Sequence, residues 1–224
     1  MNGDAQSCPL IELRDVSYMY PDGRVIFESL NVQFPTHHLV KLQGPSGSGK
    51  STILRLIARL LAPVSGEIVY RGVASCEMDP LKWRKEIRYV QQTPVIPDST
   101  IRSFLVFGLR IMRKETPADN VLYMHIRHLF EEEISLDEYA RNLSIGQQQR
   151  LGLLRAAITD PDVLLFDEPT SALDGDAERR VEQWMLGLRD NEGKNIIVAT
   201  HRDLLKDSDC LSYRIDGTTI RCDR

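Results

Sequence analysis

The sequence of 224 residues predicts an α/β fold, and three observations predict it. Two wholly apolar runs, 163–166 and 196–199, are separated by an amphipathic helical pattern, which is typical of buried parallel strands. Residues 10–43 alternate between apolar and polar side chains, as an antiparallel sheet covered on one face does. A glycine-rich loop that starts at Gly44 joins a strand to a helix. We therefore expect a parallel core with an N-terminal antiparallel β subdomain.

The elements around the glycine-rich loop follow from the spacing of apolar residues. Alternation on either side of a register break predicts β structure at 25–34, and the last strand before the loop is expected at 39–43. A helix over 51–62 carries its apolar residues on one side. Pro63 is expected to end this helix, because proline cannot continue it.

The region 93–145 has a different, mostly helical pattern with one clear helix start. Thr116 is a good N-cap, Pro117 would occupy the first helical position and Asp119 the third. A helix over 147–159 follows, and strands and helices then alternate again. We therefore expect the helical region to interrupt the α/β core.

The composition is that of an ordinary soluble domain, with 42% hydrophobic residues, 27% charged residues and a formal net charge of −4. A net acidic chain is a poor candidate for binding nucleic acid through its overall field, so no nucleic-acid partner is expected. No stretch approaches the roughly 18 apolar residues that span a bilayer. Residues 1–9 lack the apolar core of a secretory signal. We expect a cytoplasmic protein that reaches any membrane through a partner chain.

Cysteine and histidine do not point to a metal centre. His125 and His128 could share a helix face, but with no third ligand nearby we expect a half-exposed helix instead. The four cysteines are scattered without a Cys-x-x-Cys pair, which favours reduced thiols over a disulfide framework or a zinc site. They are Cys8, Cys76, Cys210 and Cys222.

The glycine-rich loop fits the pattern G-x-x-x-x-G-K-[ST] and lies between a strand and a helix, the context that this motif requires. Its backbone N–H groups and the helix N-terminus direct positive partial charge at phosphates. Lys50 is expected to reach the β- and γ-phosphates, and Ser51 to offer a hydroxyl to Mg²⁺. The alternative, a plain glycine-rich turn before a helix, is disfavoured by the complete motif. The loop comprises Gly44, Pro45, Ser46, Gly47, Ser48, Gly49, Lys50, Ser51 and Thr52.

Two carboxylates, Asp167 and Glu168, end the apolar run 163–166. At the carboxyl end of a parallel strand beside a phosphate loop, Asp167 is placed to hold Mg²⁺, and Glu168 to poise the attacking water as general base. Alone, the pair would be only a polar strand exit before Pro169. Together with the phosphate loop, it predicts nucleotide hydrolysis.

The segment 143–150, Leu-Ser-Ile-Gly-Gln-Gln-Gln-Arg, precedes this strand and begins a helix. Ser144 is a good N-cap, and Gln147 completes a capping box, so the segment could be only a helix start. The order of phosphate loop, L-S-x-G-Q segment and apolar run ending in Asp-Glu nevertheless resembles the ATP-binding cassette (ABC) ATPases. In that family this helix start is the signature motif, whose Ser144, Gly146 and Gln147 counterparts contact the nucleotide of the opposite subunit. Ile145 departs from the family's usual glycine, and a β-branched residue requires an ordinary φ there.

The resemblance covers nearly the whole chain and implies further site residues. Tyr20 resembles the aromatic that stacks on adenine, with Tyr18 as the competing candidate. Gln92 resembles the glutamine that reaches the metal and the attacking water, and the adjacent Gln91 is the alternative.

Two more positions follow from the resemblance. Asp174 ends a Ser-Ala-Leu-Asp segment that matches the loop bridging two subunits, so it is expected near the nucleotide. His201 directly follows the run 196–199 and Thr200, and it matches the histidine that contacts the γ-phosphate. Singly, His201 would be an ordinary strand-end histidine.

The resemblance implies a P-loop NTPase fold with a RecA-like parallel core. It implies one ABC ATPase domain over 1–224, with residues 1–92 and 146–224 forming the ATP-binding core and 93–145 the helical subdomain. The chain would be the ATP-hydrolysing subunit of an ABC transporter, with ATP and Mg²⁺ as cofactors. Two copies would pair head to tail around two ATP molecules.

The expected membrane partner is a separate polytopic subunit, which would hold the chain on the inner face of the cell membrane. The family docks this partner on the segment after Gln92, although its apolar residues could equally form the core of the helical subdomain. These residues are Phe104, Phe107, Leu109, Ile111 and Met112.

Two other classes of function fit the sequence less well. A soluble ABC ATPase of DNA repair or ribosome work usually carries a long coiled-coil insertion or tandem cassettes, which this sequence lacks. A P-loop kinase or GTPase is disfavoured by the signature, and a GTPase would need an N-K-x-D motif. The Gln92-Thr93-Pro94 segment and the compact length resemble small bacterial cassettes implicated in iron or metal-ion export.

Overall fold

The computed structural model describes residues 9–202, 204–205 and 208–223, so Cys8 lies outside the described residues. The strands form a four-stranded antiparallel sheet, in the order β2-β1-β4-β5, and a six-stranded sheet, in the order β10-β9-β3-β8-β7-β6. The strands are β1 (Ile11–Met19), β2 (Val25–Phe34), β3 (Leu39–Gln43), β4 (Ser65–Tyr70), β5 (Val73–Ala74), β6 (Ile87–Val90), β7 (Val163–Asp167), β8 (Asn195–Ala199), β9 (Leu211–Asp216) and β10 (Thr219–Asp223). The helices are α1 (Lys50–Ile57), α2 (Pro80–Glu86), α3 (Ile101–Ile111), α4 (Asp119–Leu129), α5 (Ile145–Ile158) and α6 (Gly175–Glu192), with a 3₁₀ turn η1 at Ala140–Asn142.

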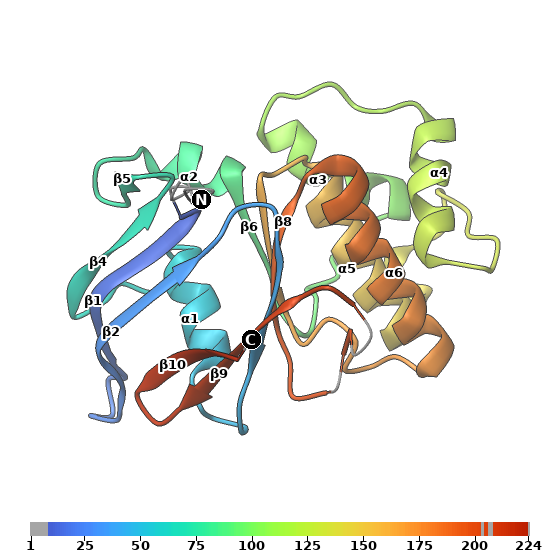
Figure 1. Ribbon diagram of the computed structural model, residues 1–224. Helices are drawn as coiled ribbons and strands as arrows, with labels where there is room; N and C mark the ends of the chain where they lie inside the picture. Colours follow the sequence, from blue (N-terminus) through green and yellow to red (C-terminus); the bar gives the residue numbers. More distant parts are fainter. Residues whose placement is uncertain (1–8, 203, 206–207, 224) are drawn as a thin grey trace, which may run out of the picture.

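The six-stranded sheet lies between α1 with the antiparallel sheet on one side and α5 and α6 on the other, as Figure 1 shows, and an apolar core fills each side. Successive residues of a strand point to opposite faces, so each buried strand contributes to both cores. In β7, for example, Leu164 packs among α3, α4, α5 and α6, whereas Leu165 packs against α1 and the antiparallel sheet. This explains why the runs 163–166 and 196–199 are wholly apolar, as the predicted parallel core requires.

The helical region interrupts the sheet at one point in the chain. Strands β6 and β7 are parallel neighbours, with Val90 opposite Phe166, yet α3, α4, η1 and α5 lie between them in the sequence. Helices α3 and α4 pack against α5 and share its core, to the right in Figure 1. The expected interruption of an α/β core by helices is therefore confirmed.

Two helix ends differ from the sequence prediction. Helix α1 ends at Ile57 rather than at residue 62, because Arg59 adopts a left-handed φ of 56° and the chain reverses there. The guanidinium of Arg59 donates to the Met78 carbonyl at 2.9 Å and lies over the Trp83 ring, so tertiary contacts hold this turn. A local sequence pattern does not report such contacts.

The start predicted at Thr116 is also wrong by two residues. Helix α4 begins at Asp119 with an extended Ala118 as its N-cap, and no side chain caps it. An ion pair from Arg102 of α3 to Asp119 fixes the first turn against the neighbouring helix. Pro117 consequently lies in the loop before the helix, where its missing N–H has no cost.

Several short elements were not predicted from the sequence. These are β4, β5, α2, β6, β9 and β10. Strand β4 pairs with β1 and completes the antiparallel sheet, and β9 extends the parallel sheet beside β3. Strand β10 is largely exposed, so it lacks the apolar alternation that would reveal it.

Candidate nucleotide site

The phosphate loop runs from the end of β3 into α1. Its last glycine, Gly49, is the N-cap of α1 at a φ of 100°, and a Cβ there would lie 2.5 Å from Cζ of Phe27. Only glycine fits both conditions. The Lys50 ammonium group, almost buried, donates to the carbonyls of Gly44 at 2.8 Å and Pro45 at 3.0 Å. The loop is thus closed around a positive charge, while the first N–H groups of α1 have no partners within the helix.

Asp167, at the end of β7, accepts hydrogen bonds from two hydroxyl groups. The Ser51 hydroxyl donates to Oδ1 at 2.8 Å, and the Tyr89 hydroxyl donates to Oδ2 at 2.8 Å. Burial raises the pKa of Tyr89 to about 12, so this phenol stays protonated and remains a donor. A carboxylate, a hydroxyl and the nearby Gln92 amide form an all-oxygen donor set of the kind that Mg²⁺ prefers. The residues present therefore fit Mg²⁺.

Glu168 and His201 are in direct contact. One carboxylate oxygen of Glu168 accepts the backbone N–H of His201 at 3.1 Å and lies 2.8 Å from Nδ1 of the same residue. The Glu168 side chain is only 12% exposed, whereas the His201 side chain is 59% exposed. Glu168 also has a φ of 49°, unusual for a residue with a side chain. The carboxylate is therefore held in a fixed position at the strand exit.

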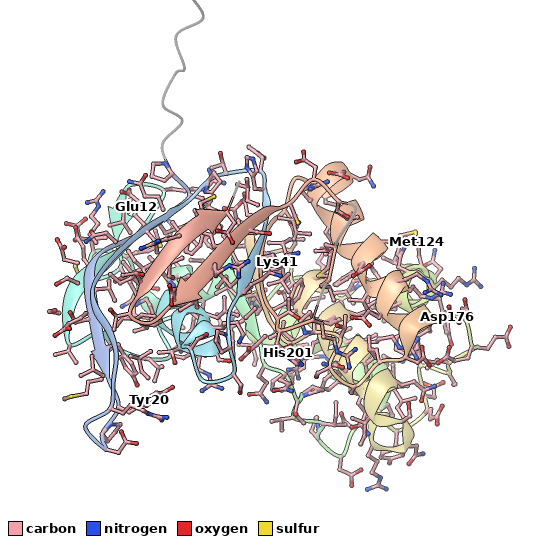
Figure 2. All side chains as sticks on the ribbon, turned by 60° about the horizontal axis from the view of Figure 1, so that its bottom comes forward. Glu12, Tyr20, Lys41, Met124, Asp176 and His201 are labelled. Atoms are coloured by element: carbon pink, nitrogen blue, oxygen red, sulfur yellow. The ribbon has the colours of Figure 1, made fainter. Side chains whose placement is uncertain are left out.

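A single hollow of about 250 Å³ brings most of the predicted residues together. It lies between the tip of the β1–β2 hairpin, the phosphate loop and the ends of the parallel strands. Figure 2 shows Tyr20 at the outer end of the hairpin and His201 nearer the centre of the molecule. The lining residues are Tyr20, Arg24, Ile26, Ser46, Gly47, Gly49, Lys50, Ser51, Thr52, Gln92, Glu168 and His201.

Neighbouring candidates differ in their access to this hollow. The Tyr20 hydroxyl is hydrogen-bonded to Thr52 at 2.8 Å and its ring lines the hollow, whereas Tyr18 is 7% exposed and packs in the core. Gln92 lines the hollow, whereas the Gln91 amide turns back to the Thr93 carbonyl at 2.7 Å. The roles assigned to Tyr20 and Gln92 stay predictions.

Two residues of the site were not predicted from the sequence. The Arg24 guanidinium lies 4.9 Å from the centre of the Tyr20 ring. Ile26 lines the hollow beside the phosphate loop. Arginine after a turn is not a signal by itself, so only the folded hairpin reveals this contact. A cation over the ring face leaves that face partly occupied, which bears on how a base could stack there.

The signature segment does not line the hollow of its own chain. Ser144 and Gln147 form the reciprocal capping box, with the Gln147 N–H donating to the Ser144 hydroxyl at 3.2 Å. Ile145 is 70% exposed and has no left-handed φ, in agreement with the ordinary backbone expected for it. Gly146 lies against Ala172, where a Cβ would approach the carbonyl oxygen to 3.1 Å.

Asp174 is also outside the hollow. It is the N-cap of α6 and accepts the Ala177 N–H at 2.9 Å. Within one chain, this capping role is enough to explain the position of the Asp174 side chain. Within one chain, the structure therefore separates Ser144, Gly146, Gln147 and Asp174 from the other predicted site residues.

A second hollow, a groove of about 400 Å³, lies between the segment after β6 and α3. Phe107 and Ile111 are exposed along it, whereas Phe104 and Leu109 are buried, so the predicted docking segment divides between surface and core. Met112 is half-buried.

Two arginines line the same groove without an acidic partner. Burial lowers the pKa of both Arg88 and Arg155, and Nε of Arg88 has no hydrogen-bond partner. None of the ion pairs among the residues that the structure describes involves either guanidinium. The groove thus combines exposed apolar side chains with two partly desolvated positive charges.

Among the residues that the structure describes, no helix has the length and apolar character needed to cross a bilayer. The same residues include no group of three or more His, Cys, Asp or Glu side chains that could hold a metal ion.

A parallel sheet with a phosphate loop after one strand and Asp-Glu at the end of a neighbouring strand defines a P-loop NTPase fold. The chain belongs to the ABC transporter family, whose pattern matches residues 27–171. It is 34% identical over 208 residues to phosphate import ATP-binding protein PstB 3 of Natronomonas pharaonis, covering 89% of this chain and 74% of that protein. The fold class and the family resemblance inferred from the sequence are both confirmed.

Other relatives are much longer. The chain is 34% identical over 203 residues to ABC transporter B family member 1 of Dictyostelium discoideum, covering 86% of this chain but only 22% of that protein. A solved dimer of the ATP-binding cassette MJ0796 in a post-hydrolysis state, bound to ADP and Pi, matches with a TM-score of 0.84 and 25% identity, covering 96% of this chain and 98% of that chain. The names of the Natronomonas and Dictyostelium relatives describe transport proteins.

Proposed function

We propose that this chain is the ATP-binding and ATP-hydrolysing subunit of an ABC transporter. The observation that carries the proposal is the single hollow shared by Tyr20, the phosphate loop, Gln92, Glu168 and His201. These residues come from distant segments, so their convergence is a property of the fold rather than of one motif. Mg²⁺ would be held by Ser51, Asp167 and Gln92, where it would neutralise charge on the phosphates.

In the proposed reaction, the Tyr20 ring stacks on the base and the N–H groups of the phosphate loop bind the phosphates. The Lys50 ammonium exchanges its contacts with loop carbonyls for the β- and γ-phosphates. Glu168 accepts a proton from the water that attacks the γ-phosphorus, and the bond to the leaving ADP oxygen breaks. His201 holds the Glu168 carboxylate and presents its exposed ring to the γ-phosphate.

The exposed helix start at Ser144 has no role within its own hollow, so we assign it to a second copy. In a head-to-tail dimer, the N-terminus of α5, with Ser144, Gly146 and Gln147, would approach the phosphates bound by the other subunit. Asp174 would lie at the same interface. Because ATP would be sandwiched between the copies, ATP binding would drive dimerisation by linkage.

The groove beside α3 is the proposed contact with a separate polytopic membrane subunit. Exposed Phe107 and Ile111 would receive the apolar face of a helix from that subunit. Arg88 and Arg155 would pair with a carboxylate on the same helix, because both guanidiniums are partly desolvated. The chain would then be cytoplasmic, on the inner face of the cell membrane, and dimer closure would move the membrane subunit.

The substitution Glu168→Gln tests the proposal. It keeps the shape of the side chain but removes the charge that accepts the proton, so we expect turnover of ATP to fall at least about 100-fold. ATP binding should persist, and the ATP-bound dimer should accumulate because repulsion beside the γ-phosphate is removed. Phosphate release measures the first effect and light scattering the second. Unchanged turnover would contradict the role of Glu168, and a wild type without ATPase activity would contradict the proposed function.

A further inference from the structure

One buried amide, that of Gln149, touches three segments of the nucleotide site. Gln149 lies on α5 and is 3% exposed. The two N–H hydrogens of its Nε2 group face three acceptors, the carbonyls of Gln92 at 3.2 Å and Glu168 at 2.9 Å and the Ser171 hydroxyl at 3.3 Å, so one hydrogen is shared between two of them. Its Oε1 accepts the Ala172 N–H at 3.1 Å. This orientation of the amide is fixed by its partners, because three acceptors surround the nitrogen and one donor faces the oxygen.

The proposed reaction requires these three segments to keep fixed positions relative to one another. Gln92 follows β6, Glu168 follows β7, and Ser171–Ala172 begin the loop that leads to Asp174. The helix that carries Gln149 begins at Ser144, the proposed contact with the second subunit. A movement of this helix start would therefore be transmitted to all three segments through one side chain.

The shortest of these contacts, the one to the Glu168 carbonyl, restrains an unusual backbone conformation. Glu168 has a φ of 49°, a conformation that persists only when the surroundings hold it. Its N–H donates to the Ala199 carbonyl at 2.8 Å, and its carbonyl accepts from Gln149. The side-chain carboxylate is held by His201. Gln149 thus supplies the restraint on the carbonyl side of this residue.

We propose that Gln149 is a positioning residue, which sets the Glu168 carboxylate for hydrolysis and links the signature helix to Gln92 and to the 171–174 loop. This inference rests on the proposed ATPase function. No sequence pattern indicates this role, since the third glutamine of a glutamine run is indistinguishable from a polar helix residue. Its role appears only in contacts between distant segments.

The test replaces Gln149 by Met, which preserves length and burial but cannot form these hydrogen bonds. We expect turnover of ATP to fall about 10- to 100-fold, because a small displacement of a catalytic group has effects of this size. The dissociation constant for ATP should change less than about 3-fold, because Gln149 does not line the hollow. Gln148→Met is the matched control, since the Gln148 amide donates its hydrogen bonds to the carbonyls of Arg141 and Leu143, away from the nucleotide site.

A double-mutant cycle separates positioning from general destabilisation. If Gln149 acts through Glu168, then Gln149→Met should cause little further loss in a Glu168→Gln background. Additive losses would overturn the inference, as would full turnover by Gln149→Met. Gln149→Asn, which keeps the amide but shortens its reach, repeats the test if the Met variant fails to fold. A wild type that hydrolyses no ATP would overturn the proposed function and this inference together, whereas an active wild type with an equally active variant overturns the inference alone.

Discussion

The nucleotide hollow and the signature segment differ in how complete they are within one chain. The phosphate loop, the Tyr20 ring, Glu168 and His201 line the hollow, and hydrogen bonds join Ser51 to Asp167 and His201 to Glu168. The signature segment has its own capping box and a hydrogen bond from Gln147 to Glu132 at 2.8 Å, but it does not line the hollow, and Ser144 and Ile145 are exposed. A capped helix N-terminus at the surface can bind an anion only if something brings the anion to it.

This difference separates two kinds of evidence for function. The hollow lies within one chain, so variants of its lining residues test its function directly. The proposed contact of the signature segment joins two chains, so it must be tested by measurements on the dimer. Variants in the two regions should consequently fail in different ways: a change in the hollow should cost ATP binding or turnover, and a change in the signature segment should cost the dimer.

The largest effect is expected from Lys50→Ala in the hollow. This variant removes a nearly buried positive charge beside the predicted phosphate position, so it should nearly abolish ATP binding measured by titration calorimetry. Lys41→Ala is a matched control, because Lys41 is equally buried but its ammonium donates to the Leu204 carbonyl instead. Wild-type affinity in Lys50→Ala would remove the hollow as the nucleotide site.

A different failure is expected from Ser144→Arg. The arginine would fill the space where the second subunit's phosphates should lie, while the variant's own phosphate loop is unchanged. ATP should still bind, but the ATP-dependent dimer seen by light scattering in a Glu168→Gln background should be lost. Normal dimerisation of this variant would leave segment 143–147 as a capped helix start only.

Mixing variants sharpens this prediction. A dimer of one Lys50→Ala chain and one Ser144→Arg chain has both defects in one composite site and none in the other. The mixture should therefore hydrolyse more ATP than either variant alone if the sites are formed between chains. Equal inactivity of the mixture and of its components would count against composite sites that work independently.

A moderate effect is expected from the aromatic side wall. Stacking on a base contributes about 1–3 kcal/mol, so Tyr20→Ala should weaken ATP and GTP alike by roughly 10- to 100-fold. Tyr20→Trp should bind nearly normally. The comparison with Tyr18→Ala is informative because Tyr18 is buried and meets Tyr20 edge-on at 5.2 Å between ring centres. A larger loss of affinity in Tyr18→Ala than in Tyr20→Ala would reverse our choice of aromatic.

Features that depend on neighbouring residues could be predicted from the sequence, whereas features that depend on contacts between distant segments could not. The runs 163–166 and 196–199 and the capping box at Ser144 were predictable, because apolar burial and N-cap chemistry depend on neighbouring residues. The end of α1 was not, because contacts of Arg59 with a distant segment hold the reversal.

The same division applies to the site. The phosphate loop and Asp167 follow a fixed spacing, so their positions could be read from the sequence. The arginine over Tyr20 and the amide of Gln149 could not, since each acts across segments that only folding brings together. The groove arginines are a further case, because a lack of acidic partners is visible only in three dimensions.

The smallest effects should come from single truncations at the helix start, and they separate structural from intersubunit roles. Ser144→Ala removes the hydroxyl that accepts the Gln147 N–H, so it should lower the free energy of unfolding by about 1 kcal/mol. Ile145→Gly removes a side chain that is 70% exposed, so the change should stay within about 0.5 kcal/mol. Thermal melting of both variants without nucleotide measures the pair. A loss in Ile145→Gly that exceeds the loss in Ser144→Ala would mean that Ile145 stabilises the chain itself. With the expected order, any effect of Ile145→Gly on the ATP-bound dimer belongs to the contact between subunits.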